Sequence, residues 1–156
     1  MNAFERLKQI IQALNEENVD YALFGGQAVN LHGILRFTED IDLFVSPTPE
    51  NVHRLCQALR RIWQDPAIDE IRVEDLAGEY AVVRYGTPDG FYIDLVSRLG
   101  EAFRFDDIET QTLALADIHA KVATPRMLYR MKSQTIRPID RADALDLKAK
   151  FHLEDE

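Results

Sequence analysis

The sequence predicts a mixed α+β fold, in which helices flank a mixed sheet and further helices follow at the C-terminus. Three observations predict it. Short apolar runs of strand-like composition alternate with longer segments whose apolar residues recur at helical spacing. Gly, Pro and Asp residues separate these segments, as is typical of turns. With 156 residues, the chain is long enough to bury a hydrophobic core without disulfides.

The first quarter of the chain predicts two helices and two strands. Residues 3–17 carry apolar side chains at helical spacing, which predicts an amphipathic helix. Residues 21–24 are a short apolar run and predict a strand. Residues 27–33 predict a short helix that ends at a glycine, and residues 40–45 alternate in polarity as a strand does.

A second long helix is expected over residues 49–63. Thr48 can accept a hydrogen bond as the N-cap, and Pro49 suits the first helical position because its missing N–H would have no partner there. Residues 71–73 follow and are expected to add a strand at the edge of the sheet.

The second half predicts a hairpin and two helices. Residues 80–85 and 91–96 flank a turn rich in Gly, Pro and Asp, which predicts two antiparallel strands. Residues 112–123 fit a strand or a helix equally well. A cap followed by proline predicts a helix over residues 125–134, and a last helix is expected over residues 138–151.

Domain organisation follows from this order of elements. The sequence contains no internal repeat and no linker, so we expect one domain over residues 1–156. Within it, residues 1–110 are expected to form the α/β core and residues 111–151 a C-terminal helical segment.

The composition excludes several classes of protein. A net charge of −9 argues against non-specific binding of nucleic acid by the whole surface. No apolar run approaches the length that spans a membrane, and the N-terminus lacks the pattern of a signal peptide. The single cysteine, Cys56, excludes an internal disulfide and a cysteine-only zinc site. We therefore expect a reduced, cytoplasmic protein.

The charge is unevenly distributed along the chain. Residues 1–120 carry a net charge of −11, whereas residues 121–150 carry +5. Two interpretations remain open at this point. The basic segment is either a solvated helix surface or a positive wall that faces a polyanionic ligand.

Two aspartates are the first candidates for a functional site. Asp40 and Asp42 are two residues apart in a predicted strand, so their side chains leave the same face. Adjacent carboxylates repel each other, and a divalent cation with a preference for oxygen ligands, Mg²⁺ or Mn²⁺, removes that repulsion. The alternative is an ordinary pair of surface aspartates.

A third aspartate lies in the middle of another predicted strand. Asp94 stands among apolar residues, where a carboxylate is costly unless it has a partner. If its strand lies beside that of Asp40 and Asp42, three carboxylates converge, which is the ligand set of a two-metal centre for phosphoryl transfer. The alternative is an ion pair with an arginine such as Arg84.

Gly25 and Gly26 follow a predicted strand and precede a predicted helix. Glycines at such a position allow positive φ and let backbone N–H groups approach an anion. The alternative is a tight turn without a ligand. The pair matches neither the P-loop nor the dinucleotide-binding motif.

Other constellations are weaker. The four histidines are scattered without a metal-binding pair, and Cys56 is expected to pack in the core. Aromatic residues are also expected in the core, with base stacking as the alternative for Tyr85, Tyr92 and Tyr129. Asp140 and Asp143 are expected to pair with Arg137 and Arg141.

Taken together, residues 21–45 resemble the nucleotidyltransferase superfamily related to DNA polymerase β. Its signature is a strand, a Gly-Gly or Gly-Ser turn, a strand with Asp-x-Asp, and a third Asp on a later strand. Gly25-Gly26, Asp40, Asp42 and Asp94 match these elements in order.

The detailed form of the motif is most similar to the small prokaryotic branch of AbiEii-type toxin nucleotidyltransferases. Residues 122–132 and 137–143 are similar to the C-terminal helices of that branch. The resemblance covers residues 4–150 in scattered blocks.

The resemblance implies a nucleotidyltransferase fold and transfer of a nucleoside monophosphate from an NTP to a hydroxyl group. It implies that Asp40, Asp42 and Asp94 bind Mg²⁺ or Mn²⁺. It further implies that Asp94 helps to deprotonate the attacking hydroxyl.

The same resemblance implies how the nucleotide is bound. Backbone N–H groups of Gly25 and Gly26 would contact the β- and γ-phosphates, and Lys132 and Arg36 would neutralise phosphate charge. The alternatives are a solvated lysine at position 132 and an ion pair of Arg36 with Glu39.

Partners and biological setting follow from the resemblance alone. It implies a toxin–antitoxin or phage-defence module with a cognate antitoxin, and RNA such as tRNA, a protein hydroxyl or a small molecule as the acceptor. An antibiotic nucleotidyltransferase acting on lincosamides or aminoglycosides, and a catalytically inactive binding subunit of the same fold, are the alternatives.

Overall fold

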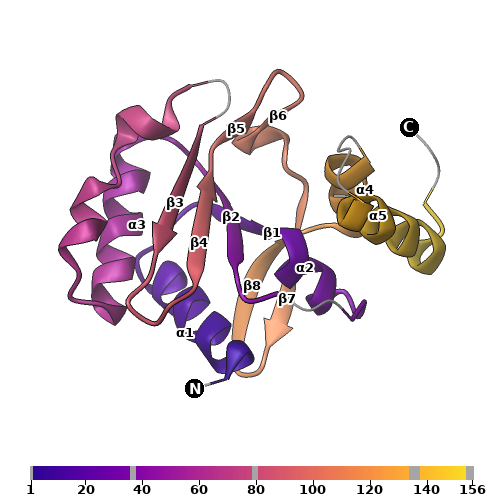
Figure 1. Cartoon of the computed structure of the whole chain (residues 1–156), viewed down its shortest axis with the longest axis horizontal. Helices are drawn as coiled ribbons and strands as arrows, with labels where there is room; N and C mark the ends of the chain where they lie inside the picture. The colour runs from indigo at the N-terminus through magenta and orange to yellow at the C-terminus, as the bar shows by residue number, and fades with distance from the viewer. Residues whose placement is uncertain (1, 36–37, 79–80, 134–137, 154–156) are drawn as a thin grey trace.

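The structure is a computed structural model and describes residues 2–35, 38–78, 81–133 and 138–153. Helices and strands alternate in its first half, and two helices end the chain (Figure 1). The α-helices are α1 (Ala3–Glu16), α2 (Gly25–Leu31), α3 (Pro49–Ile62), α4 (Pro125–Ser133) and α5 (Pro138–Phe151). The strands are β1 (Tyr21–Phe24), β2 (Ile41–Val45), β3 (Val82–Gly86), β4 (Tyr92–Val96), β5 (Arg98–Leu99), β6 (Phe103–Arg104), β7 (Thr110–Leu115) and β8 (Ile118–Ala123).

Six strands form one mixed sheet in the order β3-β4-β2-β1-β8-β7, and β5 pairs with β6 in a small second sheet. β2 runs parallel to β4 and antiparallel to β1, while β1 runs parallel to β8. In Figure 1, α1 and α3 lie on one side of the six-stranded sheet, and α2, α4 and α5 lie on the other. The predicted fold, a mixed sheet flanked by helices with further helices at the C-terminus, is confirmed.

Local capping explains where the two long N-terminal helices begin. The side chain of Asn2 accepts a hydrogen bond from the N–H of Glu5, and that of Thr48 accepts one from the N–H of Asn51. These bonds satisfy backbone donors that have no partner in the first turn of a helix. The expected start of α3 at Pro49 is therefore confirmed. None of the helices in the described ranges is long and apolar enough to cross a bilayer.

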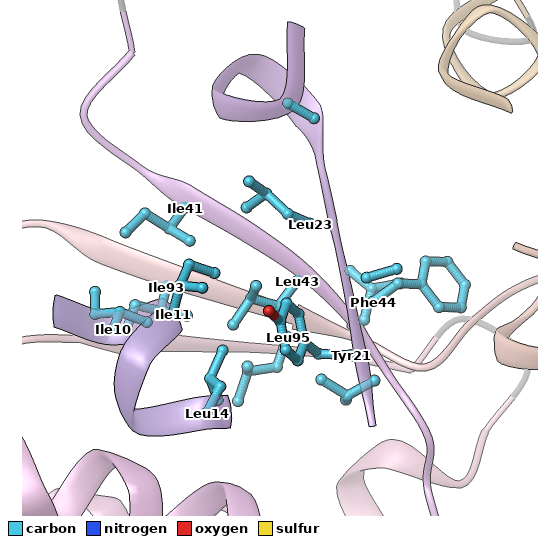
Figure 2. Close-up of a cluster of buried hydrophobic side chains, with 14 of the residues drawn as sticks. Ile10, Ile11, Leu14, Tyr21, Leu23, Ile41, Leu43, Phe44, Ile93 and Leu95 are labelled. Carbon is cyan, nitrogen blue, oxygen red and sulfur yellow. The ribbon is translucent and has the colours of Figure 1, made fainter. Parts of the chain in front are cut away.

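Much of the hydrophobic core lies between the sheet and the pair α1 and α3. Figure 2 shows Ile10, Ile11 and Leu14 of α1 beside Leu43 of β2 and Leu95 of β4. All five side chains are almost completely buried, and burial of each such side chain stabilises the fold by about 1.5–3 kcal/mol. The opposite face of β2 and β4 is the one that carries the polar residues of interest.

Residues 112–123, left open between strand and helix, belong to the antiparallel hairpin of β7 and β8, which begins at Thr110. The pairing of β8 with β1 brings this hairpin into the main sheet. The expected boundary between the α/β core and a helical segment at residues 110 and 111 therefore falls inside β7. The helical part begins only at Pro125, after the last strand.

The expected edge strand over residues 71–73 is wrong. Asp65 caps a 3-10 helix over Pro66–Glu70, and the N–H of Ile71 bonds to the carbonyl of Ile68. Val73 then begins a second 3-10 helix over Val73–Leu76. The backbone groups are thus used locally and cannot pair with a neighbouring strand. The short helix α2 also differs from expectation, because it begins at Gly25, two residues earlier than predicted.

Candidate active site

The residues of the candidate site form one row across the sheet. Strand pairing places Asp42 of β2 opposite Phe24 of β1 on one side and opposite Asp94 of β4 on the other. Arg84 of β3 is in turn opposite Asp94. Because paired positions of neighbouring strands lie about 5 Å apart and project side chains to the same face, these three polar side chains meet.

Asp40 joins this row from the segment that precedes β2. It lies one residue before the strand, which begins at Ile41 and not at residue 40 as expected. The Asp40 carboxylate accepts hydrogen bonds from Arg84 Nη2 at 2.9 Å and from the N–H of Tyr92 at 3.3 Å. Its backbone carbonyl accepts a hydrogen bond of 3.4 Å from the buried side chain of Gln27 in α2. The structure thus brings Asp40, Asp42 and Asp94 to one place.

Gly25 lies directly against the Asp42 carboxylate. Its φ is +69°, a conformation that L side chains rarely adopt. A Cβ atom at this position would lie 3.0 Å from Asp42 Cβ and 2.8 Å from Cγ, and closer still to Oδ2. Glycine is therefore required both by the backbone and by the space that the carboxylate occupies. Gly26 follows, buried, in the first turn of α2, whose N-cap Phe24 offers no side-chain hydrogen bond.

The carboxylates of Asp42 and Asp94 are in an environment that favours protonation. Burial, followed by the negative charge of Asp94, raises the pKa of Asp42 to about 7, and the charge of Lys132 partly opposes this. Burial also raises the pKa of Asp94, against the opposing charge of Arg84. A site in which burial and neighbouring negative charge raise the pKa of a carboxylate is one in which an added cation is favoured.

Lys132 of α4 is the cation expected on the basic segment, and it lies on the Asp42 side of the sheet. Its side chain is buried and forms an ion pair of 3.0 Å with Asp143 of α5, which is equally buried. Sequence reasoning missed this pair, because nothing in the spacing of two helices identifies which residues meet across them. The ion pair ties α4 to α5 beside the carboxylates.

Two other sequence predictions concern residues outside the described ranges. Arg36, expected to contact phosphate, lies outside the described residues, and so does Arg137. The side chain of Asp140 is likewise outside them.

Arg84 and Tyr92 complete the site on the side of β3. The guanidinium of Arg84 lies 3.4 Å from the Asp94 carboxylate through Nε and packs over the Tyr92 ring, 3.9 Å from its centroid. The sequence-based alternative of an ion pair between Asp94 and Arg84 is confirmed, and Asp40 is a second partner that was not foreseen. Tyr85 and Tyr129 are buried, as expected, whereas Tyr92 is 44% exposed.

The donor set suits a divalent cation, although the side chains as they stand are arranged around Arg84. Within the described ranges, no group of three His, Cys, Asp or Glu side chains is positioned to hold a metal ion. Asp40 and Asp94 both face the guanidinium, so a positive charge already occupies the space between them. Three carboxylates supply the hard oxygen ligands that Mg²⁺ and Mn²⁺ prefer. The residues present therefore fit a metal that replaces the guanidinium.

Comparison with solved structures supports the fold. The crystal structure of an antigenic nucleotidyltransferase-like protein from Paracoccidioides brasiliensis matches with a TM-score of 0.61 and 20% sequence identity. The match covers 95% of this chain and 76% of that chain. At this identity the likeness establishes a shared nucleotidyltransferase-like fold. Comparison with curated protein sequences gives no match.

Comparison with protein families is more specific. The family described as "Nucleotidyl transferase AbiEii toxin, Type IV TA system" matches residues 9–142. This range contains the Gly25-Gly26 turn, the three aspartates and Lys132. The chain therefore belongs to the AbiEii family of nucleotidyltransferase toxins.

Proposed function

We propose that this protein is a Mg²⁺-dependent nucleotidyltransferase that transfers a nucleoside monophosphate from an NTP to a hydroxyl group, as the toxin of a toxin–antitoxin module. The observation that carries the proposal is the pairing of Asp42 with Asp94 in adjacent parallel strands, with Asp40 beside them. Membership of the AbiEii family supports the reaction class and the setting.

Asp40, Asp42 and Asp94 would hold the Mg²⁺ or Mn²⁺. When bound, the metal would neutralise charge on the transferred phosphate and lower the pKa of the acceptor hydroxyl. Asp94 would also accept the proton of that hydroxyl, as a carboxylate beside the reacting group can. Gly25 fixes the position of the Asp42 carboxylate by close contact.

The triphosphate would bind on the side of α2 and α4. No side chain caps the N-terminus of α2, so backbone N–H groups at Gly25 and Gly26 would contact phosphate oxygens without competition from a cap. Lys132 supplies positive charge at the same face, held in place by Asp143. The basic character of residues 121–150 fits a polyanionic ligand at this end of the molecule.

The acceptor and the partner are inferred from the family. We infer an RNA acceptor such as tRNA, since the basic helices offer a second polyanion a favourable surface, and a cognate antitoxin. Transfer to a small molecule such as a lincosamide or an aminoglycoside is the second candidate, favoured by the acidic character of residues 1–120. The cytoplasmic location stays a prediction.

Transfer of label from α-³²P NTPs in the presence of Mg²⁺ tests the proposal. Separate reactions would contain total RNA, a protein extract, and aminoglycosides with lincosamides as acceptors. We expect labelled RNA with the wild-type protein and none with Asp42→Asn. Asp117→Asn is the matched control, because Asp117 is an exposed aspartate in the turn between β7 and β8.

Three outcomes decide the matter. Labelled RNA supports the proposal, and labelled antibiotic favours the second candidate. Absence of transfer to every acceptor with all four NTPs, together with absence of NTP binding, contradicts the proposal and indicates a binding subunit of the same fold.

A further inference from the structure

The side chain of Arg84 is placed where a metal between Asp40 and Asp94 would be. Its Nη2 donates to Asp40 at 2.9 Å, and its Nε lies 3.4 Å from Asp94. Both carboxylates thus share one guanidinium. A charge of +1 fills the position at which the proposed function requires a charge of +2.

Neighbouring residues hold the Arg84 side chain in this position. Strand pairing sets Arg84 directly opposite Asp94, and Gly86 opposite Tyr92. A Cβ on Gly86 would lie 3.3 Å from Tyr92 Cε1, so the absence of a side chain there gives the ring room to lie across β3. The ring in turn carries the guanidinium on its face, at 3.9 Å from its centroid. Cation–π contact and two ion pairs together hold Arg84 in this orientation.

We propose that Arg84 is an internal competitor for the metal, which must release Asp40 and Asp94 before a divalent cation can bind between them. This inference rests on the metal site of the proposed function. It explains why the carboxylates as arranged around Arg84 provide no three-ligand site in the described part of the chain. Arg84 is about half exposed, with 54% of its side chain accessible, and can move into solvent without disturbing the core.

The competition has a predictable size. A divalent cation and a guanidinium that has moved away to about 6–7 Å still repel each other in water, and removal of that repulsion corresponds to roughly a tenfold gain in affinity. The ion pairs that Arg84 makes in the metal-free protein add to the barrier against metal binding. Replacement of Arg84 by an uncharged residue of similar length should therefore tighten metal binding.

Titration of the metal-free protein with Mn²⁺, followed by the electron paramagnetic resonance signal of free Mn²⁺, tests this inference without an activity measurement. We expect Arg84→Met to bind Mn²⁺ roughly tenfold more tightly than the wild type. Tyr92→Leu retains the charge but removes the ring that holds the guanidinium, and we expect a smaller gain of about twofold to threefold.

Arg60→Met is the matched control for charge. Arg60 lies on α3, outside the row of carboxylates, and forms a surface ion pair with Asp69. We expect its Mn²⁺ affinity to stay within twofold of the wild type. An equal gain in Arg60→Met and Arg84→Met would overturn the inference, since it would then reflect net charge alone.

Direct observation of the guanidinium provides a second readout. In a ¹⁵N-labelled sample, the Nε–Hε signal of Arg84, assigned by its loss in Arg84→Met, should shift when Mg²⁺ is added. Unchanged affinity in Arg84→Met with an unmoved Nε signal would overturn the inference and leave the proposed function intact. Absence of Mn²⁺ binding by the wild type and by Arg84→Met alike would overturn both.

Discussion

Replacement of Gly25 by alanine tests whether the site depends on the contact between this glycine and Asp42. The backbone at Gly25 has a φ of +69°, and the added methyl group would overlap the Asp42 side chain. Gly90 offers a matched control. Its φ is +90°, but a Cβ added there would meet nothing within 4 Å. The pair therefore separates backbone strain from the loss of space.

The magnitude follows from these values. Alanine at positive φ costs about 1–2 kcal/mol of folding free energy, which is the whole expected effect of Gly90→Ala. In Gly25→Ala, Asp42 Cγ would lie at 2.8 Å where ordinary contact begins at 3.4 Å, so it must retreat by about 0.6 Å, and Oδ2 by more. Overpacking of this kind costs about a further 1–3 kcal/mol. Displacement of a metal-binding carboxylate by about 1 Å lowers the rate of a reaction by about 100-fold.

Urea unfolding and NTP transfer measure the two effects. We expect Gly25→Ala to unfold at lower urea concentration than Gly90→Ala and to lose about 99% of transfer activity, whereas Gly90→Ala retains wild-type activity. If Gly25→Ala stayed within threefold of wild-type activity and matched Gly90→Ala in stability, the contact with Asp42 would have no role and the reasoning would be refuted.

Three further predictions concern the buried polar groups. Lys132→Met should destabilise the fold by about 3–5 kcal/mol in urea unfolding, because it removes one charge of a buried ion pair with Asp143. Lys132→Met combined with Asp143→Leu should recover most of this stability, and a double variant no better than the single one would contradict the prediction. Burial and the charge of Asp94 raise the pKa of Asp42 from its ordinary 3.8 to about 7 in the folded protein. Between about pH 4 and pH 7 the folded state therefore binds a proton at Asp42 that the unfolded state does not, so the free energy of unfolding of the metal-free protein should fall as the pH rises through this range. Asp42→Asn should flatten this slope in urea unfolding measured at several pH values. Asn51→Ala should lower the free energy of unfolding by about 2–3 kcal/mol, because Asn51 is 1% exposed and makes three hydrogen bonds with backbone groups that flank β1 and β2. Transfer activity per folded molecule should stay unchanged.

The elements that could be predicted from the sequence are those whose signals are local. α1 and α3 were predicted to within a residue or so at their ends, because their apolar spacing and the cap at Thr48 lie within the helices themselves. The hairpin of β3 and β4 was predicted within about two residues at each end for the same reason. Its turn residues are contiguous with the strands that they connect.

The hairpin of β7 and β8 could not be distinguished from a helix for a reason that is equally physical. Four of the six residues of β7 are exposed along its outer edge, so its sequence has little of the alternation that identifies a strand. What holds the hairpin in the sheet is the pairing of Leu23 with Val122, ninety-nine positions apart. Such long-range pairing leaves no trace in a short window of sequence.

The candidate site shows the same division. The three aspartates and the Gly-Gly turn could be singled out because their residue types are unusual at their positions in predicted strands and turns. Arg84 and Lys132 were named as well, but two of the ion pairs that they form were not. The contact of Arg84 with Asp40 joins residues that are brought together only by the fold, and so does the pairing of Lys132 with Asp143.

The row formed by Phe24, Asp42, Asp94 and Arg84 has a consequence for how this protein can vary. Successive residues of a strand point to opposite faces, so insertion of one residue into β2 or β4 would turn its aspartate from the site into the apolar core. The loops between these strands carry no such constraint, except where Asp40 directly precedes β2. We therefore expect relatives of this chain to differ widely in loop length, while the number of residues within β2 and β4 stays fixed. Because a shift in register would move an aspartate away from the site, metal affinity also reports whether β2 and β4 are paired in the correct register.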